Sequence, residues 1–302
     1  MIPALPEARS NDFIDTPVDA VLLSAQMQID KKWDDLRSLL RDMNSVVLAF
    51  SGGVDSSLLL RAAAEALGPN VIAVTAVSET YPSSELDLSK QYAASLGVRH
   101  RILHTSELDR EEFIRNPPER CYHCKHELFA TLRQIADAEG IAAVVDGTNV
   151  DDQQDYRPGK KAAREFSVRS PLAEAGFSKQ DIRDLARRLD MLVWDKPSLA
   201  CLSSRIPYGT RITRQLLQNI QSAEDIVRGL GIRHVRVRHH GDTARIEVAR
   251  EDMSHVIAGD ARHKLVEALK GLGYTYVCLD LEGYRTGSMN EQLDKKTPDR
   301  VR

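Results

Sequence analysis

The chain has 302 residues, with 41 Lys or Arg, 44 Asp or Glu and a formal net charge of −3. A balance this close to zero gives no overall field that would attract nucleic acid or an anionic membrane, so we expect neither as a partner. No stretch approaches the roughly 20 apolar residues of a membrane span, and residues 1–20 lack a signal peptide's basic and apolar regions, which predicts a cytoplasmic protein.

The first half of the chain alternates predicted helices with predicted strands. A tail at 1–17 is expected to be disordered; apolar side chains recur at helical spacing over 18–43, and an apolar strand follows at 46–50. Further strands are predicted at 71–77, 100–104 and 144–146, helices at 56–68 and 83–96, and a mobile loop at 149–161. This alternation indicates a Rossmann-like, doubly wound α/β fold whose parallel sheet binds ligands at the carboxyl ends of its strands.

A glycine-rich turn joins the first strand to the next helix, with the sequence Ser51-Gly-Gly-Val-Asp-Ser. Glycines 52 and 53 allow the backbone to approach an anion, and the start of the helix offers unpaired N–H groups to phosphate. The Lys-Ser/Thr pair of a Walker loop is absent, which argues against a P-loop kinase or GTPase. The turn resembles the SGGxDS loop of the pyrophosphatase-type ATP-binding enzymes, the PP-loop family, which implies cleavage of ATP between its α and β phosphates. The plain alternative is a strand-to-helix turn that binds no ligand.

The second half is predicted to contain a smaller α+β domain. A helix is predicted at 178–189, and prolines and a glycine exclude long regular structure at 194–213. We therefore place a domain boundary near Pro207, between an ATP-binding domain at 18–206 and a small domain at 207–285. The predicted elements of the small domain are a helix at 213–230, a hairpin of strands at 234–239 and 244–248, helical stretches around Met253 and Leu265, and a strand at 274–281, before a disordered tail at 286–302.

The chain has four cysteines, too few for a disulfide scaffold, and the clustered ones favour metal or catalytic roles. Cys121 and Cys124 follow two prolines, with a helix predicted from His123 onward, and a spacing of three puts both thiols on one helix face. Cys201, in an unusual proline-punctuated segment, is the candidate third ligand. Three thiolates could hold an iron–sulfur cluster with one iron left unligated by protein. Two alternatives remain open, a redox dithiol and inert buried cysteines, and Cys278 is expected to be a core residue.

Five segments, taken in this order, resemble one family of enzymes. They are FSGGVDSSLL, NPPERCYHCK, DGTNVDD, PSLACLSSRIPYG and VRVRHHGDTARIEV. Each is shared with other PP-loop enzymes, but the set is similar to the ATP-dependent sulfur transferases named LarE, over residues 45–282.

The resemblance implies a reaction and a set of cofactors. The reaction is adenylation of a carboxylate of pyridinium-3,5-biscarboxylic acid mononucleotide, with loss of pyrophosphate, followed by attack of a sulfur nucleophile to give a thiocarboxylate for the nickel-pincer cofactor of lactate racemase. In one branch of the family the cysteine matching Cys201 gives up its own sulfur. Because this chain also has Cys121 and Cys124, it looks like the branch in which three cysteines hold a [4Fe-4S] cluster. The resemblance also suggests a homo-oligomer, with a hexamer as the candidate assembly.

The same resemblance assigns the ATP site. Residues 51–56 would cradle pyrophosphate, with Asp55 helping to fix Mg²⁺, or else serving only as an acid favoured by the helix dipole. The expected ATP-binding residues are Ser51, Gly52, Gly53, Asp55, Ser56, Gly147, Thr148, Asn149 and Asp152.

A small acceptor that carries a phosphate and two carboxylates needs cations. Arg236 and Arg238 share one strand face because their spacing is two, so together they could grip a phosphate. Lys125 and Arg205 each follow a cysteine by four residues. The expected acceptor-binding residues are Lys125, Ser204, Arg205, Glu224, Arg236, Arg238 and Glu247, of which the two glutamates are the weaker assignments. Without the resemblance, Arg236 and Arg238 would be interpreted as solvated surface charges.

Three other functions compete with this one. A PP-loop tRNA thiolase would need an RNA surface, and only residues 228–240 are dense in basic side chains. An ATP-dependent amide ligase would share the glycine loop but has no use for the cysteines. A non-catalytic adenylate sensor leaves both the cysteines and the basic hairpin unexplained.

Overall fold

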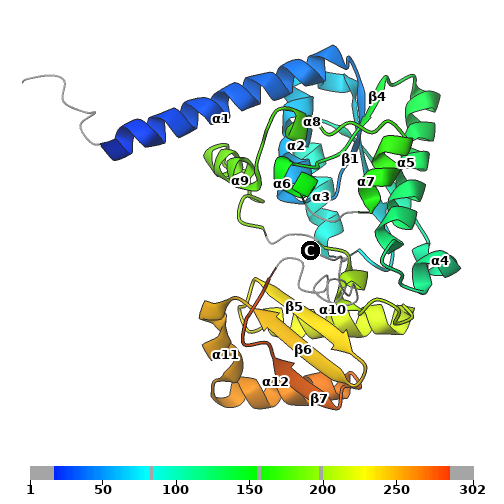
Figure 1. Cartoon of the computed structure of the whole chain (residues 1–302), viewed down its shortest axis with the longest axis vertical. Coiled ribbons are helices and arrows are strands. Elements are labelled where there is room, and N and C mark those ends of the chain that lie inside the picture. Colours follow the sequence, from blue (N-terminus) through cyan, green and yellow to red (C-terminus); the bar gives the residue numbers. More distant parts are fainter. Residues whose placement is uncertain (1–16, 82–83, 155–157, 197–199, 286–302) are drawn as a thin grey trace, which may run out of the picture.

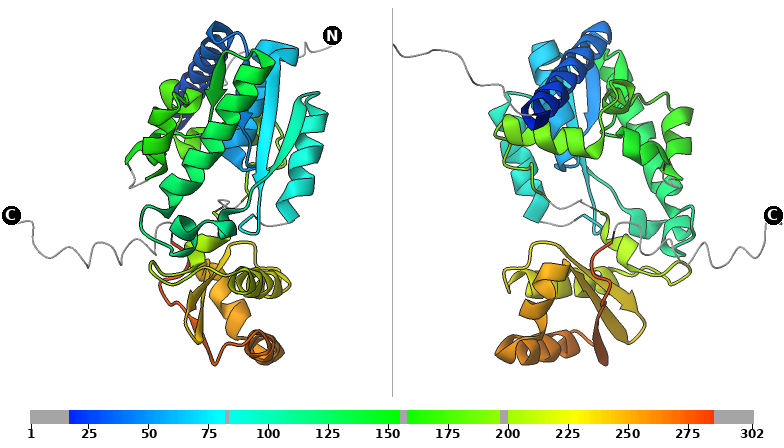
Figure 2. Two further views of the ribbon diagram at one scale, coloured as in Figure 1. Left: turned by 90° about the vertical axis from the view of Figure 1, so that its right-hand side faces the viewer. Right: turned by 60° about the vertical axis from the view of Figure 1, so that its left-hand side comes forward.

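The computed structural model describes residues 17–81, 84–154, 158–196 and 200–285. These residues form a four-stranded sheet of order β3-β2-β1-β4 and a three-stranded sheet of order β5-β6-β7, which lie in two stacked parts of the chain (Figures 1 and 2). The predicted α/β fold with a smaller C-terminal α+β part is confirmed. Both predicted disordered tails lie outside the described residues, apart from Pro17.

The larger sheet is parallel throughout. Its strands are β1 (Val46–Ala49), β2 (Val71–Val77), β3 (Arg99–His104) and β4 (Ala143–Val145). From β1 the chain proceeds to β2 and β3 on one side, and β4 then pairs with β1 on the other side. This reversal is a topological switch point, so the loops that follow β1 and β4 flank one crevice, where doubly wound sheets bind their ligands.

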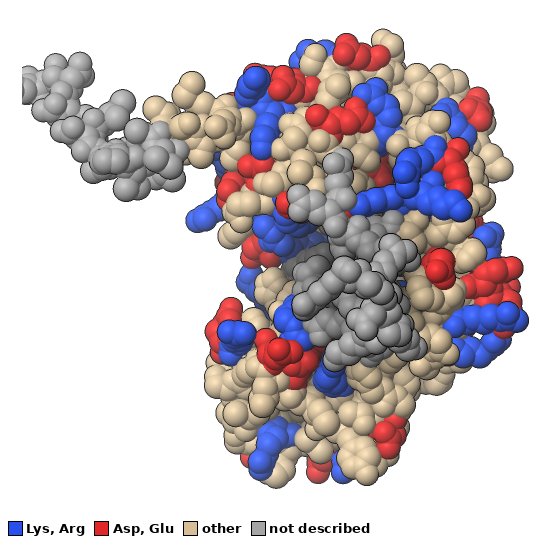
Figure 3. All heavy atoms as spheres, in the orientation of Figure 1, with Lys and Arg blue, Asp and Glu red and all other residues tan. Residues whose placement is uncertain are grey.

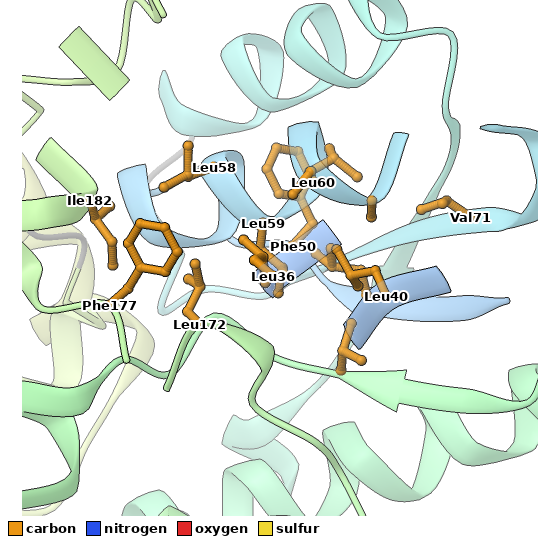
Figure 4. Packing of buried hydrophobic residues seen from close by; sticks show 14 of the residues in the cluster. Leu36, Leu40, Phe50, Leu58, Leu59, Leu60, Val71, Leu172, Phe177 and Ile182 are labelled. Carbon is orange, nitrogen blue, oxygen red and sulfur yellow. The ribbon is translucent and has the colours of Figure 1, made fainter. Parts of the chain in front are cut away.

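Helices cover both faces of this sheet because β1 and β2 are apolar on both faces. On one face, Val46 and Leu48 join a core formed largely by α1 (Pro17–Asp42), α2 (Val54–Leu67) and α9 (Lys179–Arg188), with contributions from α3 (Ser84–Ser95) and α8 (Pro171–Glu174). Figure 4 shows this packing, with Leu36 of α1 beside Leu59 of α2. On the other face, Val47 and Ile72 pack against α5 (Arg120–Glu139) and α7 (Gly159–Glu165).

The prediction of a mobile loop at 149–161 is wrong for the residues of this range that the structure describes. Two helices occupy this region, α6 (Val150–Gln154) and α7. Asp151 and Asp152 lie in the first turn of α6, where the helix dipole favours acids. At the start of α7, a Cβ on Gly159 would come within 3.0 Å of Lys125 Cγ, so α7 packs closely on α5. The acids and the glycine that suggested a loop in this range therefore belong to the first turn of α6 and to the contact between α7 and α5.

Two further differences concern the segment before and within the cysteine motif. A short helix, α4 (Glu111–Ile114), was not predicted. Helix α5 begins at Arg120, earlier than the predicted start at His123, so both Cys121 and Cys124 lie in its first turns.

The smaller part consists of a sheet with helices on one face. Its elements are α10 (Arg214–Arg228), β5 (Val235–His240), β6 (Thr243–Val248), α11 (Met253–Ile257), α12 (Gly259–Gly271) and β7 (Tyr276–Leu279). Strands β5 and β6 form the predicted antiparallel hairpin, and β7 pairs in parallel with β6. Val235, Val237 and Ile246 pack into the core of this part, and Arg236 and Arg238 alternate onto the opposite face.

The described residues of segment 194–213, which leads from the larger part to α10, lack long regular structure, as predicted. Its described residues form only the short 3₁₀ turn η3 (Leu202–Arg205). None of the helices in the described ranges is long and apolar enough to span a membrane.

Candidate active site

The glycine loop lies between β1 and α2, and its hydroxyl groups hold it closed. Ser51 N donates to Ser56 Oγ at 3.3 Å, and Ser56 Oγ donates in turn to Gly53 O at 3.1 Å. Gly52 has φ +71°, a backbone conformation that glycine adopts without strain. Gly53 precedes the first residue of α2, whose unpaired N–H groups and dipole favour an anion at this point.

The loop after β4 contacts the glycine loop directly. A Cβ on Gly147 would lie 3.0 Å from Ser56 N, so any larger residue here would push against the backbone of the glycine loop. Asn149 Nδ2 donates to Asp55 Oδ1 at 3.2 Å, and Asn149 Oδ1 accepts from Asp152 N at 3.1 Å. The structure therefore brings together the expected ATP-binding residues from both strand ends, including Thr148, which Asp146 holds through its N–H and its hydroxyl at 3.1 and 2.9 Å.

Two lysines that the sequence pattern did not identify reach the glycine loop from distant segments. Lys179, the first residue of α9, forms an ion pair with Asp55. Lys196 Nζ donates to Gly52 O at 3.1 Å and forms an ion pair with Glu85. The loop thus has no lysine of its own but has two beside it. The local sequence gives a signal for only one of them: the capping box at Ser178 places Lys179 at the start of a helix. No local motif marks Lys196.

The three clustered cysteines lie on two segments that approach each other. Cys121 and Cys124 are in the first turns of α5, and Cys201 immediately precedes η3. Burial raises the pKa of the Cys124 thiol well above its usual range, and the negative charges of Glu107, Cys201 and Cys121 raise it further. Cys121 and Cys201 are both exposed. The thiols of Cys121 and Cys201 are therefore close enough to Cys124 to affect it electrostatically.

Cys121, Cys124 and Cys201 offer sulfur ligands, which suit a soft metal group. Their side chains do not converge on one point in the described structure. Cys124 Sγ donates to Glu107 Oε1 at 3.7 Å, and among the described residues the buried Glu107 Oε2 has no hydrogen-bond partner. Thiolates are the usual ligands of iron–sulfur clusters. Within the described ranges, no three His, Cys, Asp or Glu side chains are placed to hold a single metal ion. Glu107 was not identified from sequence, because its proximity to Cys124 depends on the packing of the loop after β3 on α5.

The expectation that Cys278 is a core residue is wrong. Cys278 is exposed on β7, the edge strand of the small sheet. Its neighbour in the register is Arg245 of β6, on the polar face of that sheet. The apolar run around Cys278 was a misleading signal, because alternate residues of an edge strand face away from the core.

Five of the predicted acceptor-binding residues, Arg205, Glu224, Arg236, Arg238 and Glu247, are buried charges that lie close together. Arg205 of η3 makes a two-pronged ion pair with Glu224 of α10, at 2.8 and 3.2 Å, and both side chains are almost completely buried. Arg238 pairs with Glu247 across the hairpin at 2.8 Å and also donates to Ser204 O at 3.0 Å. The alternative interpretation of Arg238 as a solvated surface charge is therefore wrong, and Glu224 and Glu247, the two weaker assignments, are also buried.

Arg236 lies at the edge of this network. It is 5% exposed, and its guanidinium lies over the Tyr284 ring at 5.2 Å. Burial, followed by the positive charge of Arg205, lowers the pKa of Arg236 to about 10. A buried cation destabilised by a neighbouring cation favours the approach of an anion. Lys125 lies elsewhere, over the Phe129 ring of α5 at 5.2 Å.

On the face drawn in Figure 3, basic and acidic side chains are interspersed and form no extended area of one sign. This distribution matches the small net charge. A surface that tracks a nucleic-acid backbone would instead present a continuous basic area.

Comparison with known proteins agrees with this geometry. Residues 35–138 match the asparagine synthase family. A protein of Synechocystis sp. is 41% identical over 88% of this chain and 100% of its own length. Pyridinium-3,5-bisthiocarboxylic acid mononucleotide synthase of Lactiplantibacillus plantarum is 40% identical over 86% of this chain and 94% of its own length.

The chain belongs to the LarE family of PP-loop sulfur transferases. A Methanocaldococcus jannaschii protein extends this similarity, with 31% identity over 80% of the chain and 91% of its own length. As a LarE family member, the protein is an ATP-dependent sulfurtransferase, and the family implies the use of Mg²⁺ with ATP. In this chain the glycine loop, the loop after β4 and the two nearby lysines lie together beside the ends of β1 and β4.

Proposed function

We propose that this protein adenylates a carboxylate of pyridinium-3,5-biscarboxylic acid mononucleotide and converts it to a thiocarboxylate. The observation that carries the proposal is the combination of the L. plantarum similarity with a cysteine cluster beside Glu107 in a PP-loop chain. A carboxylate is a poor electrophile, so ATP must activate it before a sulfur nucleophile can attack. The phosphate site must therefore lie next to the sulfur donor.

The first step is adenylation. A carboxylate oxygen attacks the α-phosphorus of ATP, the bond to the β-phosphate oxygen breaks, and pyrophosphate leaves. In the proposal, Ser51, Gly52, Gly53 and Ser56 hold the departing pyrophosphate at the start of α2, and Asp55 binds Mg²⁺. The residues proposed to line the nucleotide from the other loop are Gly147, Thr148, Asn149 and Asp152.

The second step is sulfur transfer. A sulfur nucleophile attacks the acyl carbon, and AMP leaves with the former carboxylate oxygen, so the electron pair of the broken C–O bond ends on phosphate. Cys121, Cys124 and Cys201 are proposed to hold a [4Fe-4S] cluster, which when bound would supply sulfide at the iron that lacks a protein ligand. The nearness of Cys121 and Cys201 to Cys124 supports a bound group at this position.

The acceptor is proposed to lie between the two steps, against the buried charge network. Arg236 and Arg238 would attract its phosphate and carboxylates, with Lys125, Ser204, Arg205, Glu224 and Glu247 completing the contacts. Support comes from the position of this network, since Arg238 donates to Ser204 O at 3.0 Å, three residues after Cys201. We also propose Pro207 as the boundary between an ATP-binding domain at 18–206 and an acceptor-binding domain at 207–285, and a homo-oligomer as the assembly.

A second route for the sulfur is favoured by the exposure of Cys201. In this route Cys201 attacks the acyl-adenylate directly, and its own Cβ–S bond then breaks by β-elimination, leaving dehydroalanine and a thiocarboxylate. The two routes differ in what remains on the protein, because only the second changes the mass of the chain.

The test is product analysis with ATP, Mg²⁺ and the pyridinium dicarboxylate. We expect AMP, pyrophosphate and a thiocarboxylate from the wild-type protein, pyrophosphate without thiocarboxylate from Cys201→Ala, and neither from Asp55→Asn. Cys278→Ala, which removes an exposed cysteine outside the site, should behave as wild type. Pyrophosphate release that requires tRNA in place of the dicarboxylate would refute the proposed acceptor.

The two sulfur routes are separated by measurements on the protein itself. After anaerobic reconstitution with iron and sulfide, the cluster route predicts broad absorption near roughly 400 nm, which Cys121→Ala abolishes. The direct route predicts stoichiometric loss of H₂S from Cys201 in the intact mass after turnover. A colourless protein of unchanged mass that still forms product would contradict both.

A further inference from the structure

The segment that carries Cys201 is fastened to the start of the cysteine helix α5 by two buried polar side chains. They are Asn116, the second residue after α4, and Arg120, the first residue of α5. Neither contacts the glycine loop in the described structure, and neither has a role in the proposed function.

Asn116 binds the Cys201 segment through both its side chain and its backbone. Its side chain is fully buried, and Nδ2 donates to Ile206 O at 3.3 Å and to Pro207 O at 2.8 Å. Its carbonyl oxygen accepts from Gly209 N at 2.9 Å. The backbone of Asn116 has φ +56°, a left-handed conformation that asparagine tolerates better than most residues. That conformation turns the chain so that the amide side chain points at the Cys201 segment.

Arg120 adds a second connection one helical turn later. It is 4% exposed, and its Nη1 donates to Ser203 O at 3.0 Å and to Asn116 Oδ1. Its guanidinium lies over the Tyr208 ring at 5.7 Å. Within the described ranges no carboxylate pairs with it, so this buried charge is satisfied by carbonyl oxygens and an aromatic ring. Apart from Asn116, every one of these partners belongs to residues 203–208.

The two cysteine segments are also joined by a backbone hydrogen bond from Ile212 N to Ile114 O at 2.8 Å, by the exposed ion pair of Arg211 with Glu111, and by nonpolar packing. Phe113, Leu202 and Ile206 share a core cluster to which Cys124 also contributes. Apolar contacts have no fixed direction, whereas two buried hydrogen-bonding side chains fix the register of one segment on the other.

We propose that Asn116 and Arg120 are positioning residues that hold Cys201 against Cys121 and Cys124. The role in sulfur delivery rests on the proposed function, but the contact can be tested without ATP or acceptor. Loss of Arg120 would leave Ser203 O and Asn116 Oδ1 without a donor, and a misplacement of about 1 Å can lower a transfer rate by roughly a hundredfold.

The direct test is thiol crosslinking in the full chain. A short bis-maleimide is reacted with reduced protein, and peptides that join Cys201 to Cys121 or Cys124 are measured by mass spectrometry. We expect Arg120→Met to reduce the crosslinking rate at least tenfold and Arg120→Lys to restore part of it, because lysine keeps the charge but cannot present two oriented N–H groups. The matched control is Arg115→Met, because Arg115 is exposed and forms an ion pair with Glu111 at 3.0 Å.

Two further measurements exclude general misfolding. Thermal unfolding identifies any variant that does not fold, in which case Asn116→Gly is used, since glycine keeps the positive φ but loses the amide. ATP–pyrophosphate exchange should stay within about twofold of wild type in a correctly positioned ATP site, while thiocarboxylate formation falls roughly a hundredfold. A folded Arg120→Met or Asn116→Gly protein that crosslinks at the wild-type rate overturns the positioning role. Failure of the wild-type protein to form thiocarboxylate would instead refute the proposed function and leave the crosslinking result standing.

Discussion

Lys179 forms an ion pair with Asp55, although 124 residues separate them in the chain. Lys179 begins α9 and Asp55 lies in the first turn of α2, so the pair joins the starts of two helices at the glycine loop. The carboxylate proposed to bind Mg²⁺ is therefore paired with a positive charge in this structure. In the proposed function Mg²⁺ would replace the lysine at this carboxylate, which would free the lysine to contact a phosphate.

Substitution of Lys179 by methionine should weaken ATP binding. A hydrogen bond to a charged group contributes roughly 1.5–3 kcal/mol, which corresponds to about a 10- to 100-fold increase in KM for ATP. The measurement is pyrophosphate release as a function of ATP concentration. Lys264→Met, at an exposed position of the small domain, is the control and should leave KM unchanged. An unchanged KM in Lys179→Met would mean that the lysine only stabilises the ATP-free loop.

Gly147→Ala should disturb the glycine loop without unfolding the protein. The added methyl would lie 3.0 Å from Ser56 N and 3.1 Å from Ser56 Cα, and both are backbone atoms that cannot rotate away. Ser56 closes the loop through its hydroxyl, so its displacement should reduce ATP-dependent pyrophosphate release by at least about tenfold, at a stability cost of roughly 1–3 kcal/mol. Gly271→Ala, in α12 with open space around the new methyl, serves as control. Unaltered pyrophosphate release in Gly147→Ala would show that the two loops need not touch during catalysis.

Glu107→Gln should lower the pKa of Cys124. Burial is the largest cause of the raised Cys124 pKa and remains in the variant, while the second cause, the negative charge of Glu107, is removed. The Cys124 pKa should therefore fall but stay above its ordinary value of about 8.5. The pH dependence of iodoacetamide alkylation at Cys124, followed by mass spectrometry, measures this change. Glu139→Gln, at the far end of the same helix, should not alter it.

Glu224→Gln should destabilise the protein strongly at neutral pH. The change leaves Arg205 buried without its carboxylate, a loss that typically costs about 3–5 kcal/mol of unfolding free energy. Asp225→Asn is the matched control, since Asp225 is the exposed neighbour and pairs with Arg228. Urea unfolding at pH 7 compares the two variants, and equal stability in both would contradict a structural role for the buried pair.

The same carboxylate predicts how stability depends on pH. Burial alone would raise the pKa of Glu224, but the charges and hydrogen bonds of its arginine neighbours, Arg205 first, outweigh burial and lower it. A carboxyl with a lowered pKa stabilises the folded state above its unfolded pKa of about 4.3 and loses that contribution as the pH falls through the folded value. Stability of the wild type should therefore decline below about pH 4, and this part of the decline should be missing in Glu224→Gln. Urea midpoints measured from pH 6 downward test it.

Local sequence signals predicted the parallel strands, the glycine loop and the hairpin because each depends on residues close together in the chain. Val46 to Phe50 is apolar at every position, and the glycines at 52 and 147 mark strand ends. The cysteine pair was equally visible. Helix starts at Val150 and Gly159 were missed because polar and glycine-rich composition is typical of loops as well as of helix N-termini.

Residues that depend on tertiary contacts could not be found in this way. Lys179, Lys196 and Glu107 lie on separate segments, and only the folding of the sheet brings them to the glycine loop or to Cys124. Burial of Glu224 and Glu247 was also hidden, since an acid on a helix or strand gives no sign of an arginine partner elsewhere.

The segment that connects the two sheets looks like an ordinary interdomain linker but should not behave as one. Leu202 N donates to Thr80 O at 3.1 Å, Ile212 N donates to Ile114 O at 2.8 Å, and Arg205 donates to Ala200 O at 2.7 Å. Linkers between domains commonly tolerate insertions because few contacts fix their length. Here the length is fixed by hydrogen bonds along the described segment, so an inserted residue between 200 and 212 would shift Cys201 relative to both halves of the protein.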